Sequence, residues 1–177
     1  SVYRNLFNGA NRDHSIVILT DGYTAGDNVL YIWRKETPER QLLYGIPIEQ
    51  RVKDQQVKLL GIGMCSFTPD GKGLLFRSNI FTDGGSVTYL SLDDPANAIE
   101  VPVSGIQHKG TGELVDVKLV DTDRFLLIYN IEGCSWLYEC RFQENKALIR
   151  LEVMRTLCGL PPLADGVLFG VDFEVQE

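Results

Sequence analysis

Hydrophobic and polar residues alternate in short segments along this chain, and turn-forming residues separate the segments. Residues 66–79 (SFTPDGKGLLFRSN) show the arrangement, because two apolar stretches flank Pro69, Asp70 and Gly71. Proline presets φ and glycine accepts a positive φ, so this tripeptide is expected to form a tight turn. A period of two with short turns predicts antiparallel β-meanders. Strands are expected at 16–19, 29–33, 74–76, 87–92, 99–103, 125–129 and 136–142.

A unit of four strands is repeated about three times along the chain. The segments NVLYIW, SVTYLS and SWLYEC align so that Tyr31, Tyr89 and Tyr138 occupy equivalent positions. An apolar segment precedes each tyrosine and a weaker one follows it, and 59–67 and 114–119 are further strand candidates ahead of the second and third units. A repeat of about 50 residues with four short strands is typical of β-propeller blades.

We therefore expect an all-β fold, in which one domain over residues 1–177 forms a partial β-propeller. It should contain about three four-stranded antiparallel blades at 1–50, 57–105 and 112–157, and the start of a fourth within 165–177. A blade packs both of its faces against neighbours, which explains why GLLF and FLLIY are apolar on both faces. Because propellers close with roughly four to eight blades, we expect the chain to be a piece of a larger protein.

Two features leave alternatives open. Residues 144–157 (ENKALIRLEVMRTL) are rich in helix formers and fit an amphipathic helix, but apolar and polar residues alternate at 149–153, which favours a strand. The three repeat tyrosines, with Trp33 and Trp136, could form a surface on which a ligand stacks. Their register within the units instead favours a place in the core between blades.

The repeat resembles the propeller repeat of the prolyl-oligopeptidase family of serine peptidases, in the stretches CSFTPDGKGLLFRSN and GGSVTYLSLDD. That repeat has an aromatic residue, a Pro-Asp-Gly turn, an apolar strand ending in an aromatic residue, and a strand ending in Leu-Asp. The tail LCGLPPLADGVLFGVDFE also resembles the family's passage between blades, and periplasmic scaffolds of the TolB type use a similar repeat. The matching positions are Phe67, Pro69, Asp70, Gly71, Leu74, Leu75, Phe76, Tyr89, Leu92 and Asp93.

The resemblance implies a propeller that caps an α/β-hydrolase domain carrying a Ser-Asp-His triad, and that admits short peptides but not folded proteins. We therefore expect a non-catalytic fragment that gates or orients peptide substrates. Its partners would be a peptide substrate or the hydrolase domain of the parent chain. The Glu-Glu motif with which dipeptidyl peptidases hold a substrate's amino terminus does not occur in the sequence.

Two other functions remain open at this point. A stand-alone interaction module of the propeller type could form a homo-oligomer through the unpaired edges of its blades. A small independent enzyme with a different β fold would depend on a histidine base. The chain has two histidines, His14 and His108, and both lie in polar segments, where a surface position is expected.

No motif in the sequence indicates catalysis. Residues 133–137 (GCSWL) depart from the G-x-S-x-G nucleophile motif at the last position, so a turn is expected there. The G-x-G segments at 61–63 and 110–112 do not continue to G-x-G-x-x-G, and the aspartates within 21–27 and 121–123 are too few for a calcium loop. We expect no catalytic residue, no cofactor and no metal within 1–177.

Composition narrows the possible partners and the compartment. The net charge of −7 makes nucleic acid an unexpected partner, since phosphates repel an acidic surface. No apolar run reaches the roughly 20 residues that a membrane span needs, so no membrane partner is expected. The four cysteines lack C-x-x-C spacing and are expected to be ordinary small apolar residues in a reducing compartment, which favours a cytoplasmic location.

Overall fold

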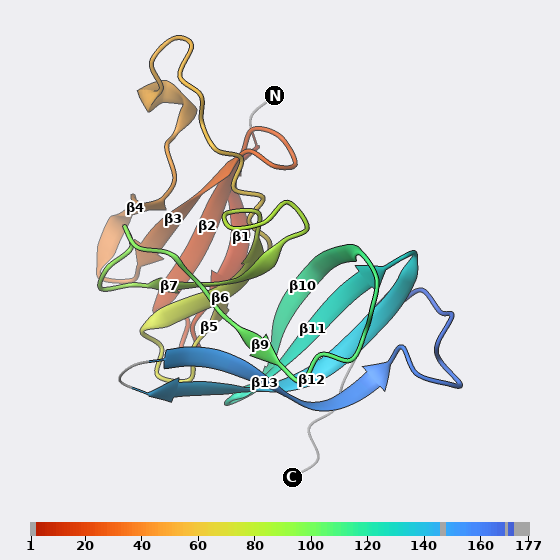
Figure 1. The fold of residues 1–177 in the computed structure, drawn as a ribbon. Helices are drawn as coiled ribbons and strands as arrows, with labels where there is room; N and C mark the ends of the chain where they lie inside the picture. The colour runs from red at the N-terminus through yellow and green to blue at the C-terminus, as the bar shows by residue number, and fades with distance from the viewer. Residues whose placement is uncertain (1–2, 146–147, 169, 172–177) are drawn as a thin grey trace.

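The chain forms three β-sheets, each with a four-stranded antiparallel meander, in the computed structural model, which describes residues 3–145, 148–168 and 170–171 (Figure 1). Sheet 1 consists of β1 (Tyr3–Ala10), β2 (Ile16–Gly22), β3 (Asn28–Arg34) and β4 (Thr37–Tyr44), and the 3₁₀ helix η1 (Ile48–Gln50) follows it. Sheet 2 consists of β5 (Ser66–Phe67), β6 (Gly73–Ser78), β7 (Ser86–Ser91) and β8 (Ile99–Glu100). Sheet 3 consists of β10 (Gly112–Asp121), β11 (Arg124–Ile131), β12 (Cys134–Asn145) and β13 (Leu148–Cys158), and the short strand β9 (Val103–Ser104) pairs with β13 in parallel.

The predicted all-β character and the four-stranded antiparallel units are confirmed. The segment that also fitted a helix is β13, in which Leu151 lies opposite Phe142 of β12 and is fully buried. The described residues include no helix that is long and apolar enough to cross a lipid bilayer.

The segment 59–67 was expected to be a strand, but only 66–67 pairs as one. The preceding residues run between sheets 1 and 2 and bond to both of them. The amide of Gly61 donates to the carbonyl of Gly26, the amide of Gly63 to that of Arg77, and the amide of Cys65 to that of Asn8. These backbone groups are therefore satisfied without a continuous strand partner. The pattern also did not predict β1, whose Phe7 lies opposite Leu19 of β2.

The expected outer strand at 99–103 is divided between two sheets. Residues 99–100 pair with β7 of sheet 2, whereas 103–104 pair with β13 of sheet 3. Pro102 lies at the break, where it has no amide hydrogen to donate, and its carbonyl accepts a hydrogen bond of 3.0 Å from the amide of Leu151. The segment thus joins the outer edges of two sheets.

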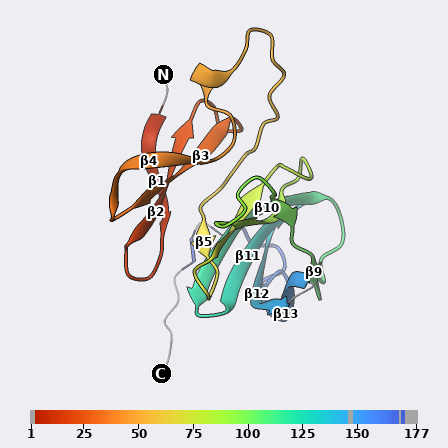
Figure 2. The same cartoon turned by 90° about the vertical axis from the view of Figure 1, so that its left-hand side faces the viewer.

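Sheet 2 lies between the other two sheets and buries both of its faces. Leu74 and Phe76 pack on sheet 1, while Leu75 and Val87 on the opposite face pack on sheet 3. The first strands of the three sheets are neighbours, because β5 contacts both β1 and β10. Figure 2 shows β5 between sheet 1 and the strands β10 and β11.

The face of sheet 3 that points away from sheet 2 carries an apolar cluster of its own. Leu126, Leu137 and Cys158 form its buried cluster, against which Leu168 and Val171 pack. The segment 165–177 was expected to begin a further strand. Residues 165–168 and 170–171 do not form one, and 169 and 172–177 lie outside the described residues.

The repeat tyrosines all lie on the third strand of a sheet, opposite a leucine of the second strand. Their partners are Leu19 for Tyr31, Leu75 for Tyr89 and Leu127 for Tyr138. Tyr89 and Tyr138 pack into the core between sheets 2 and 3 from opposite sides. Tyr31 differs from the expectation of an inter-sheet position, because it lies on the outer face of sheet 1, half-buried, with the Arg40 guanidinium 3.8 Å from its ring centroid.

Candidate functional site

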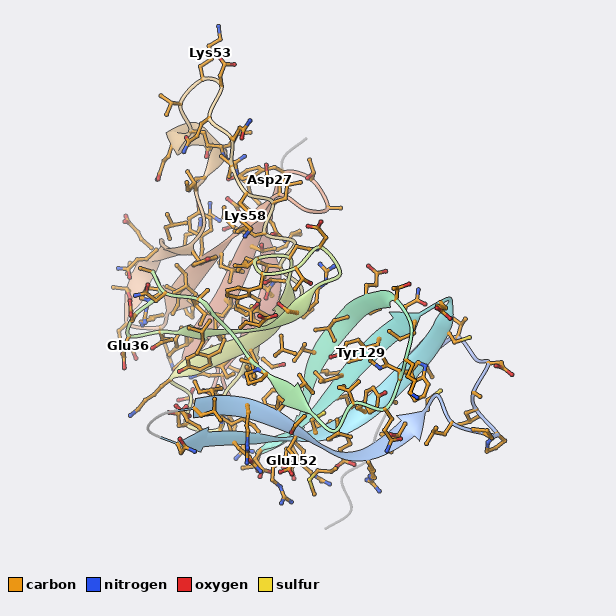
Figure 3. All side chains as sticks on the ribbon, in the orientation of Figure 1. Asp27, Glu36, Lys53, Lys58, Tyr129 and Glu152 are labelled. Atoms are coloured by element: carbon orange, nitrogen blue, oxygen red, sulfur yellow. The ribbon has the colours of Figure 1, made fainter. Side chains whose placement is uncertain are left out.

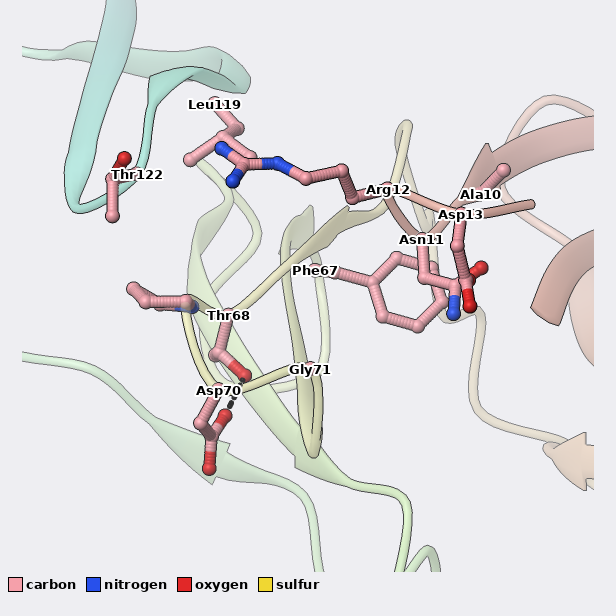
Figure 4. Close-up of a pocket in the computed structure, with 11 residues that line it drawn as sticks. Ala10, Asn11, Arg12, Asp13, Phe67, Thr68, Asp70, Gly71, Leu119 and Thr122 are labelled. Carbon is pink, nitrogen blue, oxygen red and sulfur yellow. Dashed lines mark hydrogen bonds between the residues drawn. The ribbon is translucent and has the colours of Figure 1, made fainter. Parts of the chain in front are cut away.

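Three β-turns from the three sheets surround a pocket of about 500 Å³ at one end of the molecule (Figure 4). Each turn joins the first strand of a sheet to its second strand, at 11–15, 68–72 and 122–123. Because the first strands are neighbours, the turns at their ends meet. We call this site the turn pocket. Its lining residues are Ala10, Asn11, Arg12, Asp13, Phe67, Thr68, Pro69, Asp70, Gly71, Leu119 and Thr122.

The β5–β6 turn forms one wall of the turn pocket and is held by its own side chains. The Thr68 hydroxyl accepts a hydrogen bond from the amide of Gly73 at 2.9 Å and donates to Asp70 Oδ1 at 2.7 Å. The same Asp70 oxygen accepts from the amide of Lys72 at 3.0 Å, and Gly71 has a φ of 72°, which favours glycine. The Pro-Asp-Gly motif is therefore a rigid wall of the pocket.

The β1–β2 turn is held in a comparable way. Asn11 Oδ1 accepts from the amide of Ile16 at 2.9 Å, and Asp13 Oδ1 accepts from both the amide and the hydroxyl of Ser15. His14, on the same turn, has a φ of 56° and is exposed, as expected. Both loops are thus pre-ordered, which lowers the entropy lost when a ligand binds between them.

The turn pocket carries both signs of charge. Hydrogen bonds from Ser15 hold the pKa of the Asp13 carboxyl below its usual value. Burial opposes ionisation of Asp70, but the bonds from Thr68 and Lys72 outweigh it and lower the pKa of that carboxyl as well. The Arg12 side chain extends toward Leu119 (Figure 4). The pocket can therefore bind polar or charged groups, and the described residues that line it include no histidine, cysteine or serine.

His108 is less exposed than the expected surface position implies. It is half-buried, and its ring centroid lies 4.8 Å from that of Tyr129, 5.7 Å from that of Trp136 and 5.7 Å from that of Tyr138. The polar segment 105–111 covers the edge of the core between sheets 2 and 3 and carries the imidazole inward. Ile106 of the same segment also packs against this core. The polar residues that surround His108 in the sequence gave no sign that its ring turns inward.

The hydroxyl of Tyr138 explains how His108 is held. It accepts hydrogen bonds from the amides of Gln107 and His108, at 3.3 and 3.0 Å, and lies 2.9 Å from His108 Nδ1. A phenol oxygen that accepts two bonds has its own hydrogen left to donate. Its hydrogen therefore goes to Nδ1, which assigns the neutral tautomer with its proton on Nε2. Burial lowers the pKa of His108, in agreement with a neutral ring.

The segments with a weak resemblance to catalytic motifs are structural. Residues 132–133 form the two-residue turn between β11 and β12, with φ of 52° for Glu132 and 87° for Gly133, as a type I′ hairpin turn requires. Ser135 lies in β12, and its hydroxyl accepts from the amide of Leu168 at 3.0 Å. No histidine is hydrogen-bonded to Ser135 in the part of the chain that the structure describes.

The aspartates considered for calcium are hydrogen-bonded or paired with arginines. Asp21 binds Arg40 through both carboxylate oxygens, at 2.7 and 2.8 Å, and Asp27 binds Arg51 in the same way. Within residues 3–145, 148–168 and 170–171, no group of three or more histidine, cysteine, aspartate or glutamate side chains could hold a metal ion. Cys65, Cys134, Cys140 and Cys158 are free thiols.

Sequence reasoning found one wall of the turn pocket and missed the other two. Phe67, Pro69, Asp70 and Gly71 were recognised as repeat positions, and all four line the pocket. Arg12 and its neighbours carry no motif, and the one available signal was their place in the turn that precedes an apolar strand. No protein-family model matches the chain, and a search of curated proteins finds no match either.

Proposed function

We propose that the three sheets are consecutive blades of a β-propeller, and that this propeller is the non-catalytic part of a peptidase resembling the prolyl-oligopeptidase family. In this role it would gate or orient peptide substrates. The observation that carries the proposal is the placement of sheet 2, which buries apolar side chains on both faces against its two neighbours. Propeller blades pack in this way around an axis.

The strand order within the stack supports the same proposal. The first strands β1, β5 and β10 are neighbours, whereas β4 and β8 lie at the opposite edges of their sheets. A propeller places first strands around its axis and fourth strands at its rim. The turn pocket would then lie at one end of the axis, where a peptide enters or leaves. Its ordered turns and mixed charges suit contacts with a peptide's backbone and termini.

The coding region that surrounds this segment provides the first test. We expect a G-x-S-x-G motif followed by an aspartate and a histidine beyond Glu177, in the order that α/β-hydrolases use. An in-frame stop codon directly after Glu177 would count strongly against the peptidase proposal.

Enzyme kinetics on the full gene product provide the second test. Thr122 is exposed and lines the turn pocket, so Thr122→Trp narrows the pocket without disturbing the core. We expect kcat/KM to fall for an octapeptide and to change less for a dipeptide p-nitroanilide. Lys72→Trp, on an exposed residue outside the lining, is the matched control. Equal effects of both variants on both substrates would contradict gating at this site.

Self-association is a second candidate function, which the outer face of sheet 1 favours. Phe7, Leu19, Tyr31 and Leu42 are cross-strand partners in one row over all four strands, and Phe7 and Leu42 are 61% and 40% exposed. A second copy could cover this apolar row. Sedimentation at micromolar concentration should then show a dimer that Phe7→Glu dissociates, and a strictly monomeric wild-type chain would refute this candidate.

A further inference from the structure

An apolar groove of about 490 Å³ lies between the rims of sheets 1 and 2, away from the turn pocket. It is lined by the end of β4, by the returning segment 57–60 and by three residues in the loops of sheet 2, namely Ile80 after β6, and Pro95 and Ala96 between β7 and β8. Leu43 and Ile80 form part of the core beneath it, and Ile46 at its margin is 40% exposed. The volume falls in the range of small-ligand and side-chain pockets.

Among the described residues that line the groove, Lys58 alone is charged. This side chain is exposed, and its ammonium group donates to the carbonyl of Ile80, so the cation is held against the sheet 2 wall. Figure 3 shows Lys58 near the base of the projecting segment that follows sheet 1, whereas Lys53 lies at its tip. Asp94, next to the lining residue Pro95, accepts a hydrogen bond from Asn97 Nδ2 at 2.7 Å and is not part of the lining. The charge of the groove itself is therefore positive.

The backbone next to the groove is also suited to an extended partner. Strand β4 is the last strand of sheet 1, and no further strand pairs with it among the described residues. Such an edge exposes amide and carbonyl groups to which another extended chain can bind. Sheet 3 shows the same device within this molecule, because β9 lies against the outer edge of β13 as a fifth strand.

We propose that this groove binds an extended acidic peptide segment of a partner protein, which places a large aliphatic side chain in the groove and a carboxylate beside Lys58. The apolar lining selects the aliphatic side chain, and the single cation selects the carboxylate. An aliphatic and an acidic residue two positions apart satisfy both requirements in an extended chain, since side chains at i and i+2 point to the same side. The site depends on sheet 1, the segment 57–60 and the turn at 95–96, and does not require a closed propeller.

Fluorescence anisotropy with a fluorescein-labelled, capped peptide Gly-Ser-Leu-Ser-Asp-Ser-Leu-Ser-Asp-Ser-Gly tests the proposal on the whole chain. We expect saturable binding with one peptide per chain, and none when serine replaces both leucines. Ala96 is exposed and lines the groove, so Ala96→Trp fills it without changing the core. This variant should weaken binding about tenfold or more, the effect expected when one aliphatic side chain is no longer buried.

Charge reversal tests the carboxylate contact separately. Lys58→Glu should weaken binding of the acidic peptide about threefold to fivefold, as expected for an exposed ion pair. A peptide with lysine in place of both aspartates should bind this variant more tightly than it binds the wild type. Lys53→Glu makes the same charge change at an exposed residue outside the groove and should leave both affinities unchanged.

Amide chemical shifts show where the peptide binds. On titration, the ¹⁵N–¹H signals of 42–46, 58, 80 and 96 should move, while those of the turn pocket should not. The proposal is overturned by a wild-type chain without saturable binding, by equal effects of Lys58→Glu and Lys53→Glu, or by shifts confined to the turn pocket. Failure of the proposed peptidase role would leave these results unaffected.

Discussion

Replacing Tyr138 with phenylalanine removes one hydroxyl and tests whether that group anchors the segment 105–111 to sheet 3. Tyr138 is fully buried on β12, and its oxygen is the common partner of two backbone amides and one imidazole nitrogen. The aromatic ring and its contacts with Trp136 and Tyr129 remain in the variant. Any loss of stability therefore reports the hydroxyl.

The size of the effect follows from the three hydrogen bonds. The bonds to the His108 amide and to its Nδ1 are short, at 3.0 and 2.9 Å, while the bond to the Gln107 amide, at 3.3 Å, is weaker. A net hydrogen bond contributes about 0.5–1.5 kcal/mol, and a buried group left without a partner costs about 1–3 kcal/mol. Because His108 is only half-buried, water can replace part of what is lost. We expect Tyr138→Phe to lower the free energy of unfolding by about 1.5–3 kcal/mol.

Urea unfolding followed by tryptophan fluorescence measures this change, with an unchanged m value as the sign that the native fold is retained. Tyr31→Phe is the matched control, since Tyr31 also lies on a third strand opposite a leucine and its ring is half-buried. Tyr31→Phe should lower the free energy of unfolding by less than about 0.5 kcal/mol. Equal losses in the two variants would refute the anchoring role of the Tyr138 hydroxyl.

Three further predictions concern single residues. Burial holds the pKa of His108 below its unfolded value of 6.5. The neutral ring therefore adds its full contribution to the free energy of unfolding above pH 6.5, and this contribution is lost as the pH falls toward the pKa of the folded state. The stability advantage of wild type over His108→Gln in urea unfolding should shrink from pH 7.5 to 5.0, and a constant difference would contradict this. Glu139 is buried and accepts hydrogen bonds from two arginines that reach solvent, so Glu139→Gln should cost about 1–2 kcal/mol, and less at high salt, in thermal unfolding. In Gly73→Ala the new Cβ would clash with the Tyr89 ring, so the free energy of unfolding should fall by about 1–3 kcal/mol. At Gly22 a new Cβ would have no atom within 4 Å, so Gly22→Ala should change the free energy of unfolding by less than about 0.5 kcal/mol. Similar melting temperatures for the two alanine variants would show that the Tyr89 ring moves aside without cost.

The elements that could be predicted are those whose pairing is local. Strands β6 and β7 form a regular hairpin, and each carries enough apolar residues for the period of two to be visible. The segment 59–65 has similar apolar content, yet it crosses between two sheets, and its bonds go to residues far away in the sequence. Strand β1 was missed for a related reason, because its irregular register with β2 disturbs the alternation.

The direction in which a repeat residue faces could not be predicted from alignment. Tyr89 and Tyr138 align in the sequence, but they enter the same core from opposite sheets. A shift of one residue reverses the face of a strand, and nothing in the repeat itself records such a shift. The turn pocket shows the same limit, since Arg12 and Thr122 become neighbours of the Pro-Asp-Gly turn only when three sheets stack.

The sequence by itself determined the all-β class, the division into four-stranded units and the turns within them, because alternation and turn chemistry act between residues close along the chain. The tertiary structure alone decided which faces are buried, that His108 lies against Tyr138, and that turns from three sheets share one pocket. These features depend on contacts between sheets, whose partners are separated by tens of residues and leave no periodic trace in the sequence.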